Sequence, residues 1–242
     1  MPVLANLNPL PALWSLFYPP HCAGCSSVID KGEYLCSSCQ EGAPRIQPPF
    51  CEKCSEPFFG AITQTFRCAN CEQRKLHFDA AVSLYRSRGL VRQLVHEFKY
   101  GRRPYLRHPV GRWLVETMSD LRLQGRRFDL IVPVPLHPAR ERERGFNQAT
   151  LLAELLSDRI GLPVRLVLER ARFTTSQTAH DRTERMKNLH DAFRLRKKMN
   201  VRDLRVLLID DVLTTGSTLS ECARVLKKAG ALSVFAATAA RA

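Results

Sequence analysis

No uninterrupted apolar stretch of the 242 residues approaches the roughly 20 residues that a helix needs to cross a bilayer. The apolar N-terminal stretch, residues 1–18, is broken by prolines, and no Lys or Arg precedes Lys31, so the positively charged start of a secretory signal is missing. Gly and Pro number only 12 and 15, which excludes collagen-like and low-complexity chains. We therefore expect a cytoplasmic globular protein without membrane insertion.

Acidic residues are few relative to basic ones. Lys and Arg number 37 against 23 Asp and Glu, a formal net charge of +14 at pH 7. The excess lies in residues 76–200, which hold 25 basic and 13 acidic residues, whereas residues 1–75 hold six of each. This segment predicts contact with an anion, either a nucleic acid or a phosphate-rich small molecule. A solvated basic surface is the alternative.

Cysteine is nearly absent outside one short stretch. Eight of the nine cysteines form four CxxC pairs within residues 22–71. They are Cys22, Cys25, Cys36, Cys39, Cys51, Cys54, Cys68 and Cys71. Two thiolates separated by two residues can bind one side of a tetrahedral metal, and a second pair completes the site. A disulfide framework would instead require an oxidising compartment. We therefore expect two structural Zn²⁺ ions, bound by either sequential or interleaved quartets.

The rest of the chain alternates between apolar runs and stretches of helical periodicity. Strands are expected at residues 80–85, 129–135, 165–168, 205–210 and 233–238, and helices at 90–100, 105–123, 147–160 and 217–229. This order indicates an α/β domain with a parallel sheet covered on both faces, whose ligands bind at the carboxyl ends of the strands. We expect a lead-in segment and a double zinc ribbon in residues 1–75, followed by the sheet domain in residues 76–242.

One motif follows the strand expected at 205–210. The strand runs into two adjacent carboxylates, Asp210 and Asp211, and a loop rich in hydroxyls then opens the next helix. The loop consists of Thr214, Thr215, Gly216, Ser217 and Thr218. Hydroxyls, a flexible glycine and N–H groups at a helix N-terminus form a cradle for phosphate, and paired carboxylates suit ribose hydroxyls, directly or through Mg²⁺. A strand end with a capped helix would need neither feature, so we expect a sugar-phosphate site.

The stretch from Val206 to Thr218 resembles the signature of the type I phosphoribosyltransferases, which bind phosphoribosyl pyrophosphate (PRPP). The resemblance implies that Asp210 and Asp211 contact the ribose hydroxyls, and that the loop from Thr214 to Thr218 holds the 5-phosphate. It further implies that the turn of Pro135, Leu136 and His137 holds the pyrophosphate.

Two cationic side chains are candidates for the same pyrophosphate. Lys99 lies at the end of the helix expected at 90–100, and Arg144 follows the His137 turn. Cationic side chains match phosphate oxygens in charge and geometry. The arginines around Arg144 could instead pair with Glu141 and Glu143 as a surface charge ladder.

The order of motifs along the whole chain resembles the ComF/GntX family. The motifs are four CxxC pairs, Phe98 to Arg102, Val132 to His137, Arg144 to Gln148 and the PRPP signature. The resemblance implies a PRPP-binding, phosphoribosyltransferase-like protein that uses Mg²⁺ and acts in natural competence and DNA uptake. Its implied partners are incoming single-stranded DNA and proteins of the competence machinery.

Three functions are compatible with these residues. The first is a phosphoribosyltransferase of the ComF type with an unknown acceptor, in which Asp210 and Asp211 are the catalytic candidates. The second is a non-catalytic adaptor that senses PRPP and binds nucleic acid. The third is a phosphoribosyltransferase of nucleotide metabolism unrelated to DNA uptake. The sequence contains no recognisable base-binding hood, and the basic segment 170–196 corresponds to the mobile flap of the enzymes that the motif resembles.

Overall fold

The structure of the chain is a computed structural model that describes residues 19–60, 65–172 and 191–242. The chain groups into two compact units, residues 1–43 and residues 44–242. The second cysteine quartet therefore shares a unit with the sheet, whereas the sequence predicts that it belongs to a module of residues 1–75. The predicted lead-in segment, residues 1–18, lies outside the described residues.

The first unit is built around the first cysteine quartet. Within its described part, α2 (Ser37–Glu41) follows Cys36, and an antiparallel bridge joins His21 to Val28. Its buried apolar side chains in residues 19–43 are Cys22, Leu35 and Ala43. So few buried groups cannot offset the chain entropy lost on folding, which is why a structural metal is needed here.

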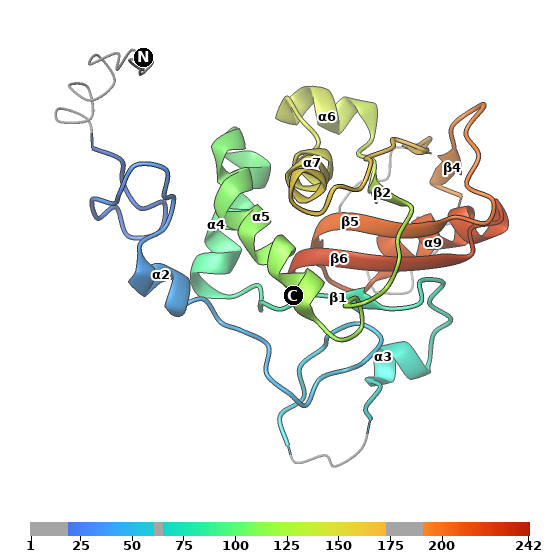
Figure 1. Cartoon of the computed structure of the whole chain (residues 1–242), viewed down its shortest axis with the longest axis horizontal. Coiled ribbons are helices and arrows are strands. Elements are labelled where there is room, and N and C mark those ends of the chain that lie inside the picture. The colour runs from blue at the N-terminus through green and yellow to red at the C-terminus, as the bar shows by residue number, and fades with distance from the viewer. Residues whose placement is uncertain (1–18, 61–64, 173–190) are drawn as a thin grey trace, which may run out of the picture. The chain divides into compact units, whose positions relative to one another are not determined.

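A four-stranded parallel sheet forms the centre of the second unit (Figure 1). In spatial order its strands are β1 (Ala81–Val82), β6 (Ser233–Arg241), β5 (Arg205–Leu213) and β2 (Leu130–Pro133). All four residues of β2 are buried, and so is the apolar run of β5 from Val206 to Ile209. The expected parallel sheet is thereby confirmed.

Helices cover both faces of this sheet (Figure 1). One face carries α5 (Arg107–Glu116) and α7 (Gln148–Ile160), with α4 (Gly89–Tyr100) packed against α5, and the other carries α9 (Ser217–Lys228). The buried side of α9 shares one apolar core with Phe78 and with all four cysteines of the second quartet. This shared core explains why the second quartet belongs to the sheet unit.

The helix predicted for residues 105–123 is shorter and flanked by 3₁₀ turns. The turns span Pro104–Leu106 and Thr117–Ser119, on either side of α5. At the end of α5 the hydroxyl of Thr117 donates to the carbonyl of Leu114 at 2.6 Å, which tightens the last turn. Asp120 then accepts the backbone N–H of Arg122, so the chain turns away instead of continuing the helix.

The strand predicted for residues 165–168 is also displaced. Val164 makes a single parallel bridge to Ile131, and the chain then leaves the main sheet. The strands β3 (Leu168–Arg170) and β4 (Phe193–Leu195) pair with each other in a separate antiparallel sheet. Two short helices complete the described fold, α3 (Ala69–Glu72) and α6 (Pro138–Arg144). No helix in the described ranges is long and apolar enough to cross a membrane.

Candidate functional site

The two adjacent carboxylates lie in the second half of β5. The strand continues past them to Leu213 because β6 pairs with it as far as Arg241, whereas the sequence predicted a strand that ends at Asp210. Successive residues of a strand point to opposite faces, so the two side chains face different neighbours. Asp211 is buried, and Asp210 is half-buried.

Lys99 reaches Asp211 from the last turn of α4. Its Nζ lies 3.0 Å from Oδ1 of Asp211, so the structure places this predicted pyrophosphate ligand beside the carboxylates. Burial by itself lowers the pKa of Lys99, but the negative charges of Asp211 and Asp210 outweigh it and raise that pKa overall. The other oxygen of Asp211, Oδ2, is buried and has no hydrogen-bond partner among the residues that the structure describes.

Two carboxylates thus share one ammonium. Burial first, and the charge of Asp211 second, raise the pKa of Asp210 to about 7, while Lys99 acts in the opposite direction. The site therefore carries unneutralised negative charge and an unused buried acceptor. It is suited to bind hydroxyl donors or a divalent cation.

The phosphate loop, residues 214–218, connects β5 to α9. Gly216 adopts a φ of +76°, a left-handed conformation that glycine reaches without strain, and α9 starts at the next residue. The hydroxyls of Thr215 and Ser217 lie 2.8 Å apart. N–H groups in the first turn of a helix have no acceptor within the helix, so this loop can surround an anion with N–H and hydroxyl donors.

The predicted pyrophosphate turn, residues 135–137, follows the neighbouring strand β2. Pro133 of β2 pairs with Ile209 of β5, so this turn leaves the sheet beside the carboxylates. His137 caps α6 by accepting the N–H of Ala139 through Nδ1 at 3.2 Å, and that fixes the ring. The turn lines a cavity of about 320 Å³ that residues of β3 and β4 also line.

Arg144 lies at the end of α6 and contacts the end of α4. Its guanidinium lies 5.2 Å from the ring centroid of Tyr100 and donates to Gln148. Tyr100 follows Lys99, so these contacts bring Arg144 to the helix end that supplies the ammonium. The ring of Phe146 stacks on that of Phe98 with 5.4 Å between their centroids, so Phe146 packs against α4.

The structure adds Arg170, which the sequence analysis did not single out. Burial first, then the charge of Arg140, lower its pKa, and Cys222 and Asp210 act on it in the opposite direction. Arg170 on β3 is therefore within electrostatic range of Asp210. The basic composition of residues 170–196 was the only signal in the sequence, and it did not distinguish this arginine from its neighbours.

The eight clustered cysteines form two separate quartets. The first ribbon (residues 22–39) groups Cys22, Cys25, Cys36 and Cys39, and the second ribbon (residues 51–74) groups Cys51, Cys54, Cys68 and Cys71. This is the sequential of the two predicted pairings. Within each quartet all sulfur atoms lie within 4.8 Å of one another. Tetrahedral zinc with Zn–S bonds of about 2.3 Å places its sulfurs roughly 3.8 Å apart, so both quartets fit it.

The thiols of the second ribbon also match zinc in charge. Hydrogen bonds from Cys54 and Cys71 lower the pKa of Cys51, and the contact with Cys51 raises the pKa of Cys71. The cluster therefore concentrates negative charge on part of its sulfurs, which a divalent cation neutralises. Both quartets are structural zinc-ribbon sites.

Comparison with known proteins gives the family. The double zinc ribbon domain matches residues 13–74, and the phosphoribosyl transferase domain matches residues 147–242. Competence protein F of Haemophilus influenzae is 32% identical over 216 residues, which cover 87% of this chain and 90% of that protein. The chain belongs to the ComF/GntX family.

Further ComF/GntX relatives extend over most of the chain. DNA utilization protein YhgH of Escherichia coli K12 is 31% identical over 223 residues, which cover 90% of this chain and 96% of that protein. Competence protein ComFC of Bacillus subtilis is 29% identical over 222 residues, which cover 88% of this chain and 87% of that protein. The solved allosteric regulatory enzyme of purine biosynthesis is 18% identical with a TM-score of 0.40, over 60% of this chain and 30% of that one, and this similarity carries no weight here.

Proposed function

We propose that this ComF/GntX protein binds PRPP together with Mg²⁺ and acts in the uptake or use of single-stranded DNA. The PRPP proposal is carried by one observation, the juxtaposition of Asp210, Asp211 and Lys99 with the phosphate loop at the end of β5. The DNA proposal is supported by the relatives named Competence protein F and DNA utilization protein.

The proposed roles follow from the chemistry of each group. Asp210 and Asp211 accept hydrogen bonds from the ribose hydroxyls, and the phosphate loop donates to the 5-phosphate. The turn at residues 135–137 holds the pyrophosphate, with Arg144 and Arg170 as cationic neighbours. The unneutralised carboxylates and the unused Oδ2 of Asp211 fit a divalent cation, and bound Mg²⁺ supplies positive charge against the pyrophosphate.

The reaction that such a site supports is phosphoribosyl transfer. The bond between ribose C1 and the pyrophosphate oxygen breaks, the bonding electron pair leaves with the pyrophosphate, and an acceptor bonds to C1. Charge placed beforehand around the leaving group supplies most of the rate enhancement. If no acceptor is used, the same site acts as a PRPP sensor. Pyrophosphate release from PRPP and Mg²⁺, measured with and without candidate acceptors, separates the enzyme from the sensor.

Calorimetry tests PRPP binding. The double variant Asp210→Asn, Asp211→Asn should lose PRPP binding in the presence of Mg²⁺ while keeping its fold. Asp203→Asn is the matched control, because Asp203 is exposed just before the other end of β5 and asparagine tolerates its positive φ of 60°. Unchanged affinity in the double variant would show that the site lies elsewhere.

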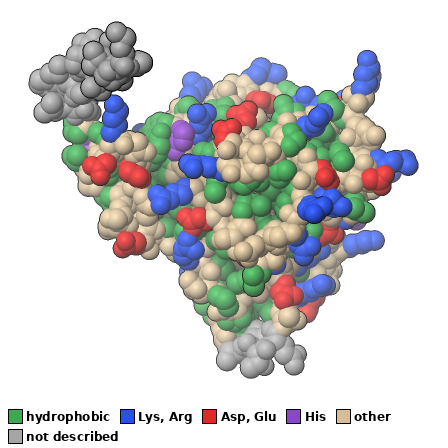
Figure 2. Space-filling model, viewed as in Figure 1, with side chains coloured by type: hydrophobic (Ala, Val, Ile, Leu, Met, Phe, Trp, Pro, Cys, Tyr) green, Lys and Arg blue, Asp and Glu red, His purple; other side chains and the backbone are tan. Residues whose placement is uncertain are grey.

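The DNA proposal rests on charge and on the relatives. Residues 76–200 hold 25 basic against 13 acidic residues, and Figure 2 shows basic side chains scattered among acidic ones on the face in view. Such a surface predicts weak binding driven by phosphate contacts with little sequence preference. The zinc ribbons are the competing contact surface.

A further inference from the structure

The second ribbon contacts the phosphate loop directly. Arg74 donates from one guanidinium nitrogen to the carbonyl of Thr215 at 3.2 Å and from another to the hydroxyl of Ser217 at 2.9 Å. Asn70 donates its side-chain amide to the same Thr215 carbonyl at 3.3 Å and accepts from Arg74 at 2.7 Å. The ribbon and the loop are therefore one hydrogen-bonded network.

The position of Asn70 links this network to the metal site. Asn70 lies between Cys68 and Cys71, the two ligands of one CxxC pair, on the short helix α3. A metal that binds both cysteines fixes the backbone between them, and with it the starting point of the Asn70 side chain. The contact to the loop is thus only one residue away from the metal ligands.

The other CxxC pair reaches the residue that precedes the loop. Arg241 at the end of β6 donates to the carbonyl of Cys54 and to the carbonyl of Leu213, both at 3.1 Å. Its guanidinium is buried and also pairs with Glu56. Each CxxC pair of the second ribbon is therefore linked by hydrogen bonds to a neighbour of Thr214, the first residue of the loop. The pair at 51 and 54 is linked to Leu213, and the pair at 68 and 71 is linked to Thr215.

The loop combines a flexible residue with an exposed one. Gly216 has a left-handed φ of +76°, a region that glycine reaches freely. Thr214 is exposed. A loop that has already lost its conformational freedom binds its ligand more tightly, because the ligand does not have to order it.

We propose that Arg74 and Asn70 are positioning residues that hold the phosphate loop in its ligand-binding conformation, and that the metal of the second ribbon sustains them in that role. This proposal rests on the proposed PRPP site for its functional meaning. The two side chains act on the carbonyl of Thr215 and the hydroxyl of Ser217, and the loop then acts on the phosphate.

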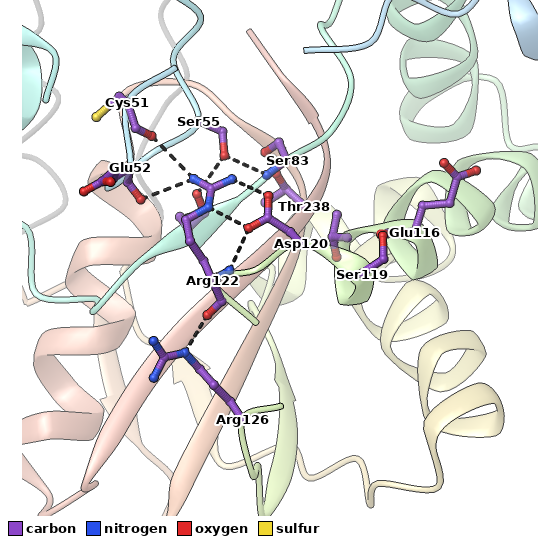
Figure 3. A network of polar contacts seen from close by, with 12 residues as sticks. Cys51, Glu52, Ser55, Ser83, Glu116, Ser119, Asp120, Arg122, Arg126 and Thr238 are labelled. Atoms are coloured by element: carbon purple, nitrogen blue, oxygen red, sulfur yellow. Dashed lines mark hydrogen bonds and ion pairs between the residues drawn. The ribbon is translucent and has the colours of Figure 1, made fainter. Parts of the chain in front are cut away.

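A different arginine fastens the same ribbon without contacting the loop. Arg122 donates to the carbonyls of Cys51 and Glu52 and pairs with Asp120 (Figure 3). Ser55 and Ser83 form a separate contact between the ribbon and the chain after β1. The ribbon therefore keeps several attachments to the sheet when Arg74 is changed, so the Arg74 contact can be removed without releasing the ribbon.

Hydrogen exchange of the backbone amides in residues 215–218 tests the positioning role without any ligand. Arg74→Ala should accelerate this exchange by about 10-fold, the effect of losing a charged hydrogen-bond donor. Arg67→Ala is the matched control, because Arg67 is an exposed arginine of the same ribbon with no hydrogen bond to the loop in the described part of the chain. It should leave the exchange unchanged. Equal exchange in wild type and Arg74→Ala, with zinc content intact, would overturn the proposal.

PRPP titration then separates charge from positioning. Arg74→Ala should weaken PRPP binding by about 10-fold, and Arg74→Lys, which keeps the charge but not the two-pronged geometry, should restore it only in part. Full restoration by lysine would contradict the positioning role. If the wild type itself does not bind PRPP, the proposed function fails, whereas the exchange experiment still decides whether Arg74 orders the loop.

The metal is tested by emptying one ribbon at a time. Cys71→Ser should accelerate exchange at residues 215–218, whereas Cys25→Ser, which disrupts the first ribbon, should not. Zinc analysis confirms that each variant has lost one of two ions. Equal exchange in both variants, at the wild-type rate, would show that the metal does not support the loop.

Discussion

At the end of β5 the free protein holds a carboxylate pair that a single ammonium cannot neutralise. Asp211 pairs with Lys99, and the half-buried Asp210 is left next to a negative charge. Burying charge without a full set of partners destabilises a fold, so this arrangement fits the proposed binding role better than a structural one. The free-energy cost of this unpaired charge is removed when a ligand supplies hydroxyl donors or a cation.

Asp210 should therefore make stability depend on pH. Its pKa is raised to about 7 in the folded chain from 3.8, so between these values the folded state binds the proton more tightly and stability falls as pH rises. Asp210→Asn should flatten this dependence and stabilise the free protein near pH 8 by on the order of 1–2 kcal/mol. Urea unfolding near pH 6 and near pH 8 measures it, with Asp203→Asn as the control. An unchanged slope in Asp210→Asn would refute the assignment.

Lys99 and Asp211 should be strongly coupled. Lys99→Met leaves a buried carboxylate without its cation and should destabilise the chain by about 3 kcal/mol, whereas the double variant with Asp211→Asn should recover part of that loss. The test is a double-mutant cycle by urea unfolding in the absence of ligand. Additive effects of the two substitutions would mean that the ion pair does not form in solution.

At the scale of elements, the second ribbon is part of the core of the sheet domain. Its four cysteines, Cys51, Cys54, Cys68 and Cys71, are all buried and pack with α9 and Phe78. The first ribbon contains Cys25, which is exposed. A metal-binding module whose ligands form the core of its neighbour cannot be removed without exposing that core.

Loss of the two metals should therefore have different effects. Cys25→Ser should unfold residues 19–43 and leave the thermal unfolding of residues 44–242 close to that of the wild type. Cys71→Ser should lower the melting temperature of the sheet unit by several degrees, because it disrupts buried packing as well as a metal site. Calorimetry with zinc analysis on both variants checks this. An equal shift of the melting temperature in the two variants would argue against the division at residue 43.

The sequence identified the local site residues and proposed Lys99 as a cationic candidate, but it missed Arg74 and Arg170, whose positions near the site depend on the fold. Asp210, Asp211 and the phosphate loop form one continuous stretch, so residue types and order were sufficient to find them. Arg74 and Thr215 lie 141 residues apart, and no pattern along the chain joins them. The pairing of the cysteines around zinc was open for the same reason. CxxC spacing shows which thiols are able to share a metal, but it does not show which of them share one in the fold.

Over the whole molecule, net charge sets the long-range behaviour. The net charge of +14 attracts polyanions, and the acidic residues mixed among the basic ones on the surface limit how many phosphates can be contacted at once (Figure 2). Aromatic residues account for 8% of the chain, which leaves few platforms for base stacking. Ionic strength should therefore control any binding to DNA.

Single-stranded DNA should bind weakly, with an affinity that falls steeply with salt. A plot of the logarithm of the association constant against the logarithm of the salt concentration should have a slope of roughly −0.7 for each phosphate neutralised. A chain that starts at residue 44 keeps the sheet unit whole and should retain most of the affinity, since it contains residues 76–200. Fluorescence anisotropy with a labelled oligonucleotide measures the salt dependence and the affinity of the shortened chain. If this shortened chain loses binding, the first ribbon is the DNA contact.

The hydrogen bond from Arg241 to Cys54 also has a consequence for the order of folding. It joins residues 187 apart, and contacts of such separation form late because a long loop must close first. The second ribbon closes over only about 20 residues, so metal can shape it while β5 and β6 are still unstructured. The ribbon would then serve as a template on which the last two strands assemble. Zinc supply during synthesis would accordingly determine how much of the chain reaches the native state.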